Sequence, residues 1–239
     1  MIPMKMIFFA DAHLARKNKK KIKFVETFVR DACSDADMVF ILGDLFEFYH
    51  GYQGYIYPWY RSIVDAFKAI TGKGKSVYFL EGNHEFDMGP FFETYTGIKC
   101  VKNLTIDVEG KRTFISHGDE FLSNPIVKAL KTPFILGAMD LLGPQLSWKI
   151  AMGLSIFMSK KKKGQNPKVK DRFREYAKAK LDEGYDAVIF AHSHISDYVE
   201  YGSGKAKKVY LNSGDFMKNF TYIEYTSESG FAVRKYAPH

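Results

Sequence analysis

Histidine and carboxylate residues occur in five short clusters along this chain of 239 residues. Each cluster follows a short apolar run, and the clusters read Asp11-Ala12-His13, Gly43-Asp44, Gly82-Asn83-His84-Glu85, His117-Gly118-Asp119 and His192-Ser193-His194. Five of the seven histidines lie in them. A single histidine after a strand is usually structural, and a single Gly-Asp pair is usually a turn. The repetition of the same arrangement instead favours one shared site.

The residue types in these clusters point to metal-dependent chemistry. Carboxylates, imidazoles and one amide, with no cysteine, disfavour a thiolate zinc or iron–sulfur site and suit Mn²⁺, Mg²⁺, Fe²⁺ or a zinc-containing pair. The candidate ligands are too many for one ion: Asp11, His13, Asp44, Asn83, His117, His192 and His194. They predict two ions that share a bridging carboxylate. Ions about 3.5 to 4 Å apart activate a shared water and stabilise in-line displacement at phosphorus.

The apolar runs before the clusters predict strands that position them. They are Met6–Ala10, Met38–Leu42, Val77–Leu80, Thr113–Ser116 and Ala187–Phe190. Continuous apolarity over so few residues is typical of strands buried on both faces of a sheet. Helices are predicted between the first three runs, over Lys17–Cys33 and Pro58–Ile70, which indicates βαβ units. Side chains beyond the carboxyl ends of such strands converge on one crevice.

The remaining strands are predicted to be antiparallel. Leu104–Val108 and Lys111–Ser116 flank the turn residues Glu109-Gly110, as in a hairpin. Val209–Leu211 and Thr221–Tyr225 are expected to form a closing pair. A mixed α/β sandwich accommodates both kinds of strand.

Residues 121–175 interrupt the series of predicted strands. They predict a helical insertion within a single domain of residues 1–239. The insertion contains two apolar helical stretches, Ile126–Leu142 and Gln145–Met158, followed by the run Lys160–Lys163. Its longest uncharged stretch, Ile150–Ser159, is much shorter than the roughly 18 to 20 residues that cross a bilayer. The composition is that of a lid that buries acyl chains while its basic edge contacts anionic headgroups. An ordinary helical hairpin with a solvated lysine tip is the alternative.

Composition excludes several protein classes. A hydrophobic content of 46% excludes a disordered or fibrous chain, and two cysteines cannot form a disulfide framework. The apolar start is interrupted at Asp11, so we expect no signal peptide and a cytoplasmic location. Lysine and arginine number 35 against 27 acidic residues, and this net charge of +8 predicts an acidic partner. The basic stretch Lys17–Lys23 is expected to face solvent on the first helix.

The five clusters, taken in order across residues 11–194, resemble the motif series of the calcineurin-like metallophosphoesterases. Ala191 stands where that family usually has glycine. The resemblance implies a four-layer α/β/β/α sandwich with the helical insertion as a cap. It implies one ion on Asp11, His13, Asp44 and His194, and a second on Asp44, Asn83, His117 and His192. His84 would be the non-ligand catalytic histidine, which stabilises the transition state or protonates the leaving oxygen.

Within that family the chain is similar to the UDP-2,3-diacylglucosamine pyrophosphatases of lipid A biosynthesis. The similarity lies in Gly43-Asp44-Leu45-Phe46-Glu47, in His117-Gly118-Asp119, in the position of the insertion and in Gly214-Asp215-Phe216. It implies Mn²⁺-dependent hydrolysis of this nucleotide-linked glycolipid to lipid X and UMP, by a metal-activated water at two divalent ions. Mn²⁺ is favoured over Mg²⁺, Fe²⁺ and Zn²⁺. The enzyme would be peripheral on the cytoplasmic face of the inner membrane.

The chain departs from those enzymes around the substrate. They usually have arginine where His84 stands, and their Thr-Asp-Asp-Tyr pattern is replaced by Glu120–Pro125. The resemblance therefore extends to the metal ligands and does not extend to the whole substrate pocket. The residues assigned to substrate contact are Asn83, His84 and His192 from the motifs and Ser159 and Lys163 from their position in the insertion. A solvated helix end is the alternative for the last two.

Two other functions fit parts of the sequence. A nuclease or nucleotide phosphodiesterase would use the same two-metal site, but the lysine runs are not interleaved with aromatics as in a single-strand groove, so nucleic acid is the weaker partner. A degenerate scaffold would typically have lost ligands, and this set is intact. No feature of the sequence predicts an oligomeric state.

Overall fold

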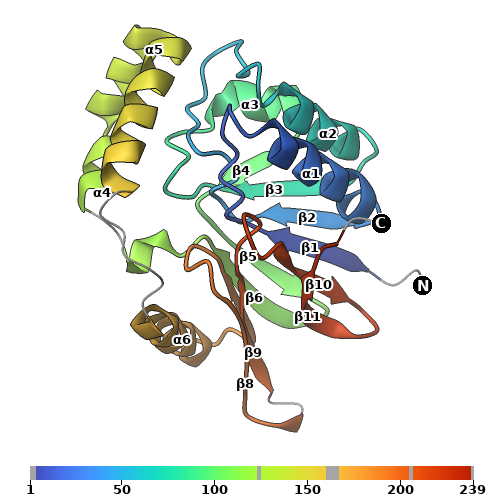
Figure 1. Ribbon diagram of the computed structural model, residues 1–239. Coiled ribbons are helices and arrows are strands. Elements are labelled where there is room, and N and C mark those ends of the chain that lie inside the picture. Colours follow the sequence, from blue (N-terminus) through green and yellow to red (C-terminus); the bar gives the residue numbers. More distant parts are fainter. Residues whose placement is uncertain (1–3, 123–124, 160–166, 205–206, 238–239) are drawn as a thin grey trace.

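The structure is a computed structural model that describes residues 4–122, 125–159, 167–204 and 207–237. Two β-sheets face each other, and helices cover their outer faces (Figure 1). The side chains of residues 125–127, 154–159 and 167 lie outside the description. Both ends of the chain lie at the side of the molecule opposite α5 (Figure 1).

The first sheet contains a parallel centre that carries three of the clusters. Its order is β11-β10-β1-β2-β3-β4, with β1 to β4 parallel and β10 and β11 antiparallel. The strands are β1 (Lys5–Phe9), β2 (Met38–Ile41), β3 (Ser76–Leu80), β4 (Lys99–Val101), β10 (Thr221–Thr226) and β11 (Gly230–Lys235). The helices that connect its parallel strands are α1 (Lys19–Phe28), α2 (Arg61–Thr71) and α3 (Gly89–Thr96).

The second sheet carries the other two clusters, in the order β5-β6-β7-β9-β8. Strands β6, β7 and β9 are parallel, and β5 and β8 pair antiparallel at the edges. The strands are β5 (Asn103–Val108), β6 (Lys111–Ser116), β7 (Ala187–Phe190), β8 (Ser196–Tyr201) and β9 (Lys208–Ser213). The helix α6 (Pro167–Asp182) covers the outer face, and the predicted hairpin at Glu109-Gly110 is confirmed by β5 and β6.

Three apolar clusters separate the layers and confirm the predicted four-layer sandwich. Along β1, Ile7 and Phe9 face the cluster under α1 and α2, whereas Phe8 faces the cluster between the two sheets. Along β7, Ile189 faces the inter-sheet cluster and Phe190 faces the cluster under α6. Because successive strand residues point to opposite faces, a strand covered on both sides needs an apolar residue at every position. The continuous apolar runs of the sequence meet this requirement.

The expected closing pair of strands is wrong. Strand β9 lies in the second sheet between β7 and β8, while β10 lies in the first sheet beside β1. Between them the chain crosses from one sheet to the other. Gly214 takes a φ of +71°, and Phe216 is buried in the first core, where its N–H donates to the Ala10 carbonyl. The burial of Phe216 there separates the two strands.

The two predicted helices are present with different bounds. The first is α1 followed by a π-helical turn at Val29–Cys33, and the second begins three residues later than Pro58, at Arg61. On α1 the expectation of a solvent-facing lysine stretch holds only in part. Lys21 is half-buried, and burial lowers its pKa to about 8, although the nearby carboxylates of Glu47 and Asp215 oppose this.

The insertion forms the short helix α4 (Pro125–Leu130) and the long helix α5 (Pro133–Ser159). Gly143 has φ 75° and ψ 170°, so α5 bends sharply before Pro144, between the two predicted helical stretches. From Pro167 the predicted insertion belongs to α6, whose Phe173 is buried against the second sheet. The run Lys160–Lys163 lies outside the described residues. Within the part of the chain that is described, no helix combines the length and apolarity needed to span a bilayer.

The loop before α2 holds α5 against the sandwich. The Tyr52 hydroxyl donates to the Met139 carbonyl over 3.1 Å, and His50 Nε2 lies 2.9 Å from Asp140 Oδ1. The Trp59 and Trp148 rings meet edge to face with centroids 5.0 Å apart. The helix α5 lies at the edge of the molecule (Figure 1), and its side chains Phe134 and Leu141 are exposed.

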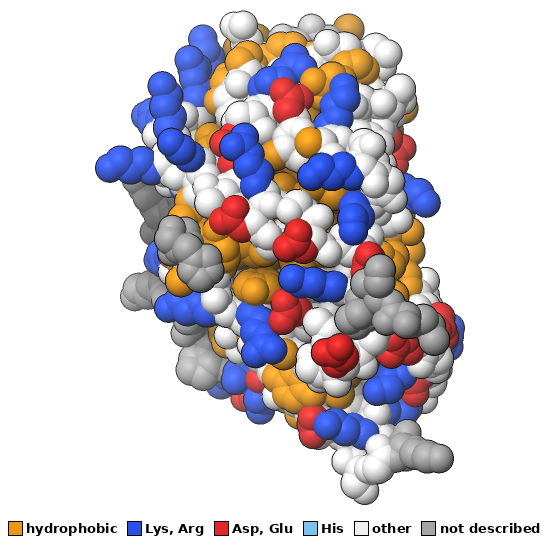
Figure 2. Space-filling model, turned by 90° about the vertical axis from the view of Figure 1, so that its right-hand side faces the viewer, with side chains coloured by type: hydrophobic (Ala, Val, Ile, Leu, Met, Phe, Trp, Pro, Cys, Tyr) orange, Lys and Arg blue, Asp and Glu red, His pale blue; other side chains and the backbone are white. Residues whose placement is uncertain are grey.

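The face away from α5 carries mixed charge. Figure 2 shows this side, where lysine and arginine side chains are interspersed with aspartate and glutamate. Blue side chains gather along the upper left edge of this view, and over the rest of the face they lie among red ones.

Candidate metal centre

All five clusters meet at one end of the sandwich, where parallel strands of both sheets end. Asp11 and His13 follow β1, Asp44 follows β2, and Asn83 follows β3. His117 follows β6, and His192 and His194 follow β7. The structure therefore brings together residues that lie up to 183 positions apart, from Asp11 to His194. Nitrogen and oxygen atoms of these residues form three groups, each within 4.8 Å: Asp11, His13 and His194; His13, Asp44 and His84; Asp44, His117 and His192.

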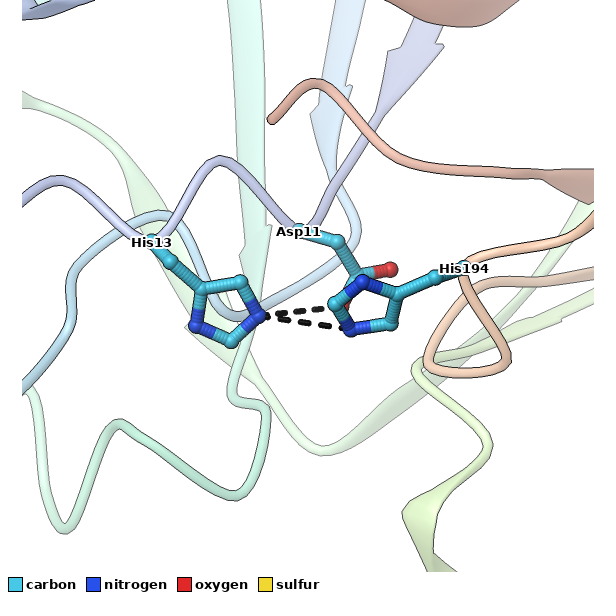
Figure 3. Close-up of side chains that lie close together, drawn as sticks. All are labelled: Asp11, His13 and His194. Atoms are coloured by element: carbon cyan, nitrogen blue, oxygen red, sulfur yellow. Dashed lines mark hydrogen bonds and ion pairs between the residues drawn. The ribbon is translucent and has the colours of Figure 1, made fainter. Parts of the chain in front are cut away.

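The first group surrounds Asp11 (Figure 3). His194 Nε2 lies 3.4 Å from Asp11 Oδ1 and 3.4 Å from His13 Nε2. His13 Nε2 lies 3.8 Å from the same Asp11 oxygen. Two ligand atoms on one ion are about 3 to 3.8 Å apart, given metal–ligand bonds of roughly 2.0 to 2.3 Å. The spacing of this group therefore fits a shared ion.

The second group surrounds His117 at the bottom of the site. His117 Nε2 lies 3.5 Å from Asp44 Oδ2 and 3.1 Å from His192 Nδ1. The other ring nitrogen, Nδ1, donates to the Leu42 carbonyl over 2.6 Å. Because a carbonyl only accepts, this bond leaves the Nε2 lone pair of a neutral ring directed at Asp44 and His192. The ring is thus held in the tautomer that a metal ligand requires.

Asp44 lies between the two groups. Its Oδ2 is 3.5 Å from His117 Nε2 and 3.8 Å from His13 Nε2, so one oxygen faces a histidine of each group. Its Oδ1 accepts the backbone N–H of His84 over 2.9 Å. This is the place that a bridging carboxylate must occupy.

Two buried oxygens without hydrogen-bond partners support a cation site. Asp11 Oδ2 accepts the His192 backbone N–H, whereas Asp11 Oδ1 is buried and unpartnered. Asn83 Oδ1 is also buried and has no hydrogen-bond partner among the described residues. Buried polar atoms are almost always satisfied, and Asp11 Oδ1 faces imidazole nitrogens of His13 and His194 at distances that suit coordination of a cation. The donor set therefore fits divalent ions.

The pKa shifts of the residues at the centre also favour a bound cation. Burial raises the pKa of Asp11 well above its usual value. Burial, the largest single effect, acts to raise the pKa of Asp44 and to lower that of His117. The surrounding groups together outweigh it: His117, His84 and His13 hold the pKa of Asp44 well below its usual value, and Asp44, Asp11 and Asp119 raise the pKa of His117 to about 10. Burial lowers the pKa of His13 well below its usual value, which favours the neutral, ligating ring.

The backbone at the centre is strained. Among the described residues, seven non-glycine residues have a positive φ, and five of them are predicted ligands: Asp11, His13, Asp44, His192 and His194. Aspartate and histidine tolerate this left-handed region better than most residues. Such conformations cost about 1 to 3 kcal/mol each and cluster at functional sites. The positive φ values turn successive predicted ligands to the same side of the chain, at the point where each strand ends.

Glu85 holds two of the ligand loops together, although the sequence analysis assigned it no role. It is fully buried, and its carboxylate accepts the backbone N–H groups of Asp44, Phe46 and Gly82 over 2.8, 3.2 and 3.0 Å. In the sequence, the only indication of this role is that Glu85 ends the Gly82–Glu85 motif. A carboxylate that follows a metal-binding asparagine by two residues can reach back to the neighbouring loop.

Gly43 is required by both its backbone and its surroundings. It has a φ of +92°, and a Cβ there would lie 2.6 Å from His117 Nδ1 and 2.7 Å from the Gly82 nitrogen. We expect Gly43→Ala to lower the free energy of unfolding by about 1 to 3 kcal/mol more than Gly54→Ala. Gly54 is a matched control because its φ is +71° and nothing lies within 4 Å of its Cβ. Thermal unfolding and metal content of both variants check this, and equal losses would contradict it.

His84 stands beside the centre with one nitrogen already engaged. Its Nδ1 donates to the Glu47 carbonyl over 2.7 Å, and its ring meets the His13 ring edge to face with centroids 4.6 Å apart. One nitrogen of His84 also falls in a group with His13 and Asp44, so geometry alone allows it to be a ligand.

A cavity of about 1540 Å³ opens from the metal centre to the cap. Asn83, His84 and His192 line its polar end, together with His13 and His194. Cap residues line the other end: Ile135, Leu136, Ala138, Met139, Leu142, Ser147, Ile150 and Ala151. Of the other predicted substrate contacts, Ser159 ends α5 and its side chain is not described, while Lys163 lies outside the described residues. Lys131, which the sequence analysis did not single out, also lines the cavity.

Comparison with known proteins agrees with this geometry. Residues 4–196 match the family described as calcineurin-like phosphoesterases. The curated relatives include a UDP-2,3-diacylglucosamine hydrolase of Aliivibrio fischeri, 24% identical over 94% of this chain and 96% of the relative. A protein of the same name from Vibrio parahaemolyticus is 26% identical over 97% of this chain and 98% of its own length.

Similar solved structures include one described as a novel archaeal phosphodiesterase, with 13% identity and a TM-score of 0.48, covering 97% of this chain and 99% of that one. The family match spans most of the chain, ends at the start of β8, and includes every predicted ligand. The chain therefore belongs to the calcineurin-like phosphoesterase family, whose members are hydrolases that use divalent metals.

Proposed function

We propose that this protein hydrolyses the pyrophosphate bond of UDP-2,3-diacylglucosamine, to form UMP and 2,3-diacylglucosamine 1-phosphate. One observation carries the proposal: a single cavity joins the metal-ligand cluster to an apolar wall formed by α5. A substrate that fits must carry a phosphoester at one end and a hydrocarbon part at the other. The curated relatives that cover nearly the whole chain bear the name of this activity.

In this proposal Asp11, His13, Asp44 and His194 hold one divalent ion, and Asp44, Asn83, His117 and His192 hold the other, with Mn²⁺ as the metal. When bound, the ions would polarise the phosphoryl oxygens and lower the pKa of a water for in-line attack. Asp44 supplies the shared carboxylate, since its Oδ2 faces both groups. His117 is held in its ligating tautomer by Leu42.

His84 acts as the catalytic residue in this scheme. The hydrogen bond from Nδ1 to the Glu47 carbonyl orients the ring and leaves Nε2 to donate a proton to the leaving oxygen. Protonated histidine suits this task because its ordinary pKa lies near neutrality. Because His84 stands on a short loop beside the ligands, its ring can stay close to the reacting phosphate within the cavity.

The helices α4 and α5 of the segment 121–175 act as the cap in this proposal. Their apolar residues Ile135, Leu136, Met139, Leu142 and Ile150 line the cavity and would bury the acyl chains. Each buried CH₂ group contributes about 0.8 kcal/mol, so acyl chains can supply most of the binding energy. The phosphates would then need only modest affinity of their own.

The decisive experiment compares two substrates. We expect the Mn²⁺-loaded protein to release UMP from UDP-2,3-diacylglucosamine in detergent faster than it cleaves bis-p-nitrophenyl phosphate. Deacylated UDP-glucosamine is the matched control, because it keeps the diphosphate and removes the chains. Cleavage of bis-p-nitrophenyl phosphate or oligonucleotides without UMP release would replace the proposal by a nucleotide phosphodiesterase or nuclease.

The outer side of α5 is proposed to rest on an anionic membrane surface. Phe134 and Leu141 are 84% and 91% exposed, and they lie seven residues apart, on one face of the helix. Large exposed apolar groups on a soluble protein usually mark a contact surface, and a lipid substrate must be taken from a membrane. The net charge of +8 favours contact with acidic headgroups.

Vesicle binding checks this surface. The double variant Phe134→Ser, Leu141→Ser is expected to bind phosphatidylglycerol vesicles at least about tenfold more weakly, because each apolar side chain contributes roughly 1.5 to 3 kcal/mol when buried. Tyr198→Ser is the control, since Tyr198 is 39% exposed on β8, away from the cap. Unchanged binding of the double variant in a sedimentation assay would exclude this face.

A further inference from the structure

A lysine of the cap segment contacts the loop that carries Asn83. Lys131 lies between α4 and α5, and its Nζ donates a hydrogen bond to the Gly82 carbonyl over 2.6 Å. Gly82 directly precedes Asn83, so this ammonium group lies beside the metal centre. Lys131 is half-buried and lines the cavity. A residue far from the motifs in sequence thus becomes part of the wall around the reacting group.

Two further lysines line the same cavity. Lys128 comes from α4, and Lys102 lies between β4 and β5. We call Lys102, Lys128 and Lys131 the basic rim. Acidic side chains also line this cavity, among them Glu81, Asp119 and Glu120. The basic rim is therefore not a general binding site for anions. Of the three lysines, Lys131 is the less exposed one and the one in contact with the Asn83 loop.

The chemistry of this position fits a phosphate. An ammonium group has three donors, and the contact with Gly82 uses one of them, which fixes the direction of the others. Hydrogen bonds between a charged donor and a charged acceptor are about twice as strong as neutral ones. A diphosphate bound at the metal centre must place its second phosphate next to the first, because the two share one oxygen.

We propose that Lys131 binds the second phosphate of a diphosphate substrate, while the metal centre binds the phosphate that is attacked. The inference rests on the proposed function for its substrate class. In this proposal the cap selects substrates that have a second phosphate, and it also binds the acyl chains. It also distinguishes this site from one that hydrolyses simple diesters, which have no second phosphate for Lys131 to hold.

A purely structural role for Lys131 makes a different prediction. If the bond to Gly82 only fastened the cap to the loop, then its loss would affect every ligand of the centre alike. The test therefore compares ligands that differ by one phosphate. Methylenediphosphonate represents the diphosphate and cannot be hydrolysed, and methylphosphonate lacks the second group.

The experiment measures binding of both probes to the Mn²⁺-loaded protein by calorimetry. We expect Lys131→Met to weaken methylenediphosphonate binding at least about tenfold, in line with loss of a charge-assisted bond, and methylphosphonate binding less than about twofold. Lys131→Arg should restore most of the difference, because it keeps the charge. Lys73→Met removes an exposed lysine that does not line the cavity and should match the wild type.

Two results would overturn the proposal: equal weakening of both probes, or no change in either. Turnover supplies the second readout, with KM for UDP-2,3-diacylglucosamine raised in Lys131→Met and the rate on bis-p-nitrophenyl phosphate unchanged. If the wild type does not release UMP at all, then the proposed function fails. The binding comparison still decides the role of Lys131, because it uses no lipid, no uridine and no turnover.

Discussion

Asp44→Ala is expected to abolish turnover and to remove metal from both positions of the centre. The Asp44 carboxylate faces His13 of one group and His117 of the other, so its loss takes a ligand from each ion. Removing residues that merely orient ligands costs about 10- to 100-fold in metal affinity or activity. We therefore expect the loss from removing the shared ligand to exceed about 100-fold.

Metal content and the rate on bis-p-nitrophenyl phosphate check this result together. Asp119→Asn is the matched control: Asp119 also lines the cavity, but it belongs to none of the three ligand groups. It should retain bound metal. An Asp44→Ala protein with two equivalents of Mn²⁺ and near-normal activity would exclude the shared carboxylate.

His84→Ala is expected to lower the rate by about 10² to 10⁴ while metal content stays near normal. This range is that of general acid catalysis by a positioned side chain. The loss should depend on the leaving group: it should be small for p-nitrophenolate, which departs without a proton, and should reach the stated range for an alkyl phosphodiester, whose alkoxide needs one. A merely structural histidine would show no such dependence.

His84→Gln provides the matched comparison. Glutamine keeps much of the side-chain volume and can still donate to the Glu47 carbonyl, but it cannot deliver a proton. It should therefore resemble His84→Ala in rate and the wild type in stability. Loss of metal in parallel with activity would instead make His84 a ligand, in the group that it forms with His13 and Asp44.

The ligand set could be predicted because each cluster is a local feature of the chain. A buried parallel strand needs consecutive apolar residues, and the polar residues that follow must lie at its carboxyl end. Asp11, Asp44 and His117 each follow such a strand directly or after one or two residues. Their convergence then followed from the rule that parallel strands end at the same edge.

Strand pairing could not be predicted in the same way. The segments that form β9 and β10 are adjacent in sequence and similar in composition, yet they belong to different sheets. What separates them is the burial of Phe216 in the first core and the conformation of Gly214, whose Cβ would otherwise lie 2.3 Å from Thr221 Oγ1. Neither contact leaves a local pattern.

The sequence by itself determined the buried strands β1, β2, β3, β6 and β7, the candidate metal ligands after them and the break in the cap at Gly143-Pro144, because each depends on residues close together along the chain. Only the tertiary structure decided which oxygen of Asp44 faces both ligand groups, how Glu85 ties two loops together, and that Lys131 reaches Gly82. These contacts join residues that are distant in sequence. Their geometry follows from how the two sheets and the cap pack, and no residue type or spacing encodes it.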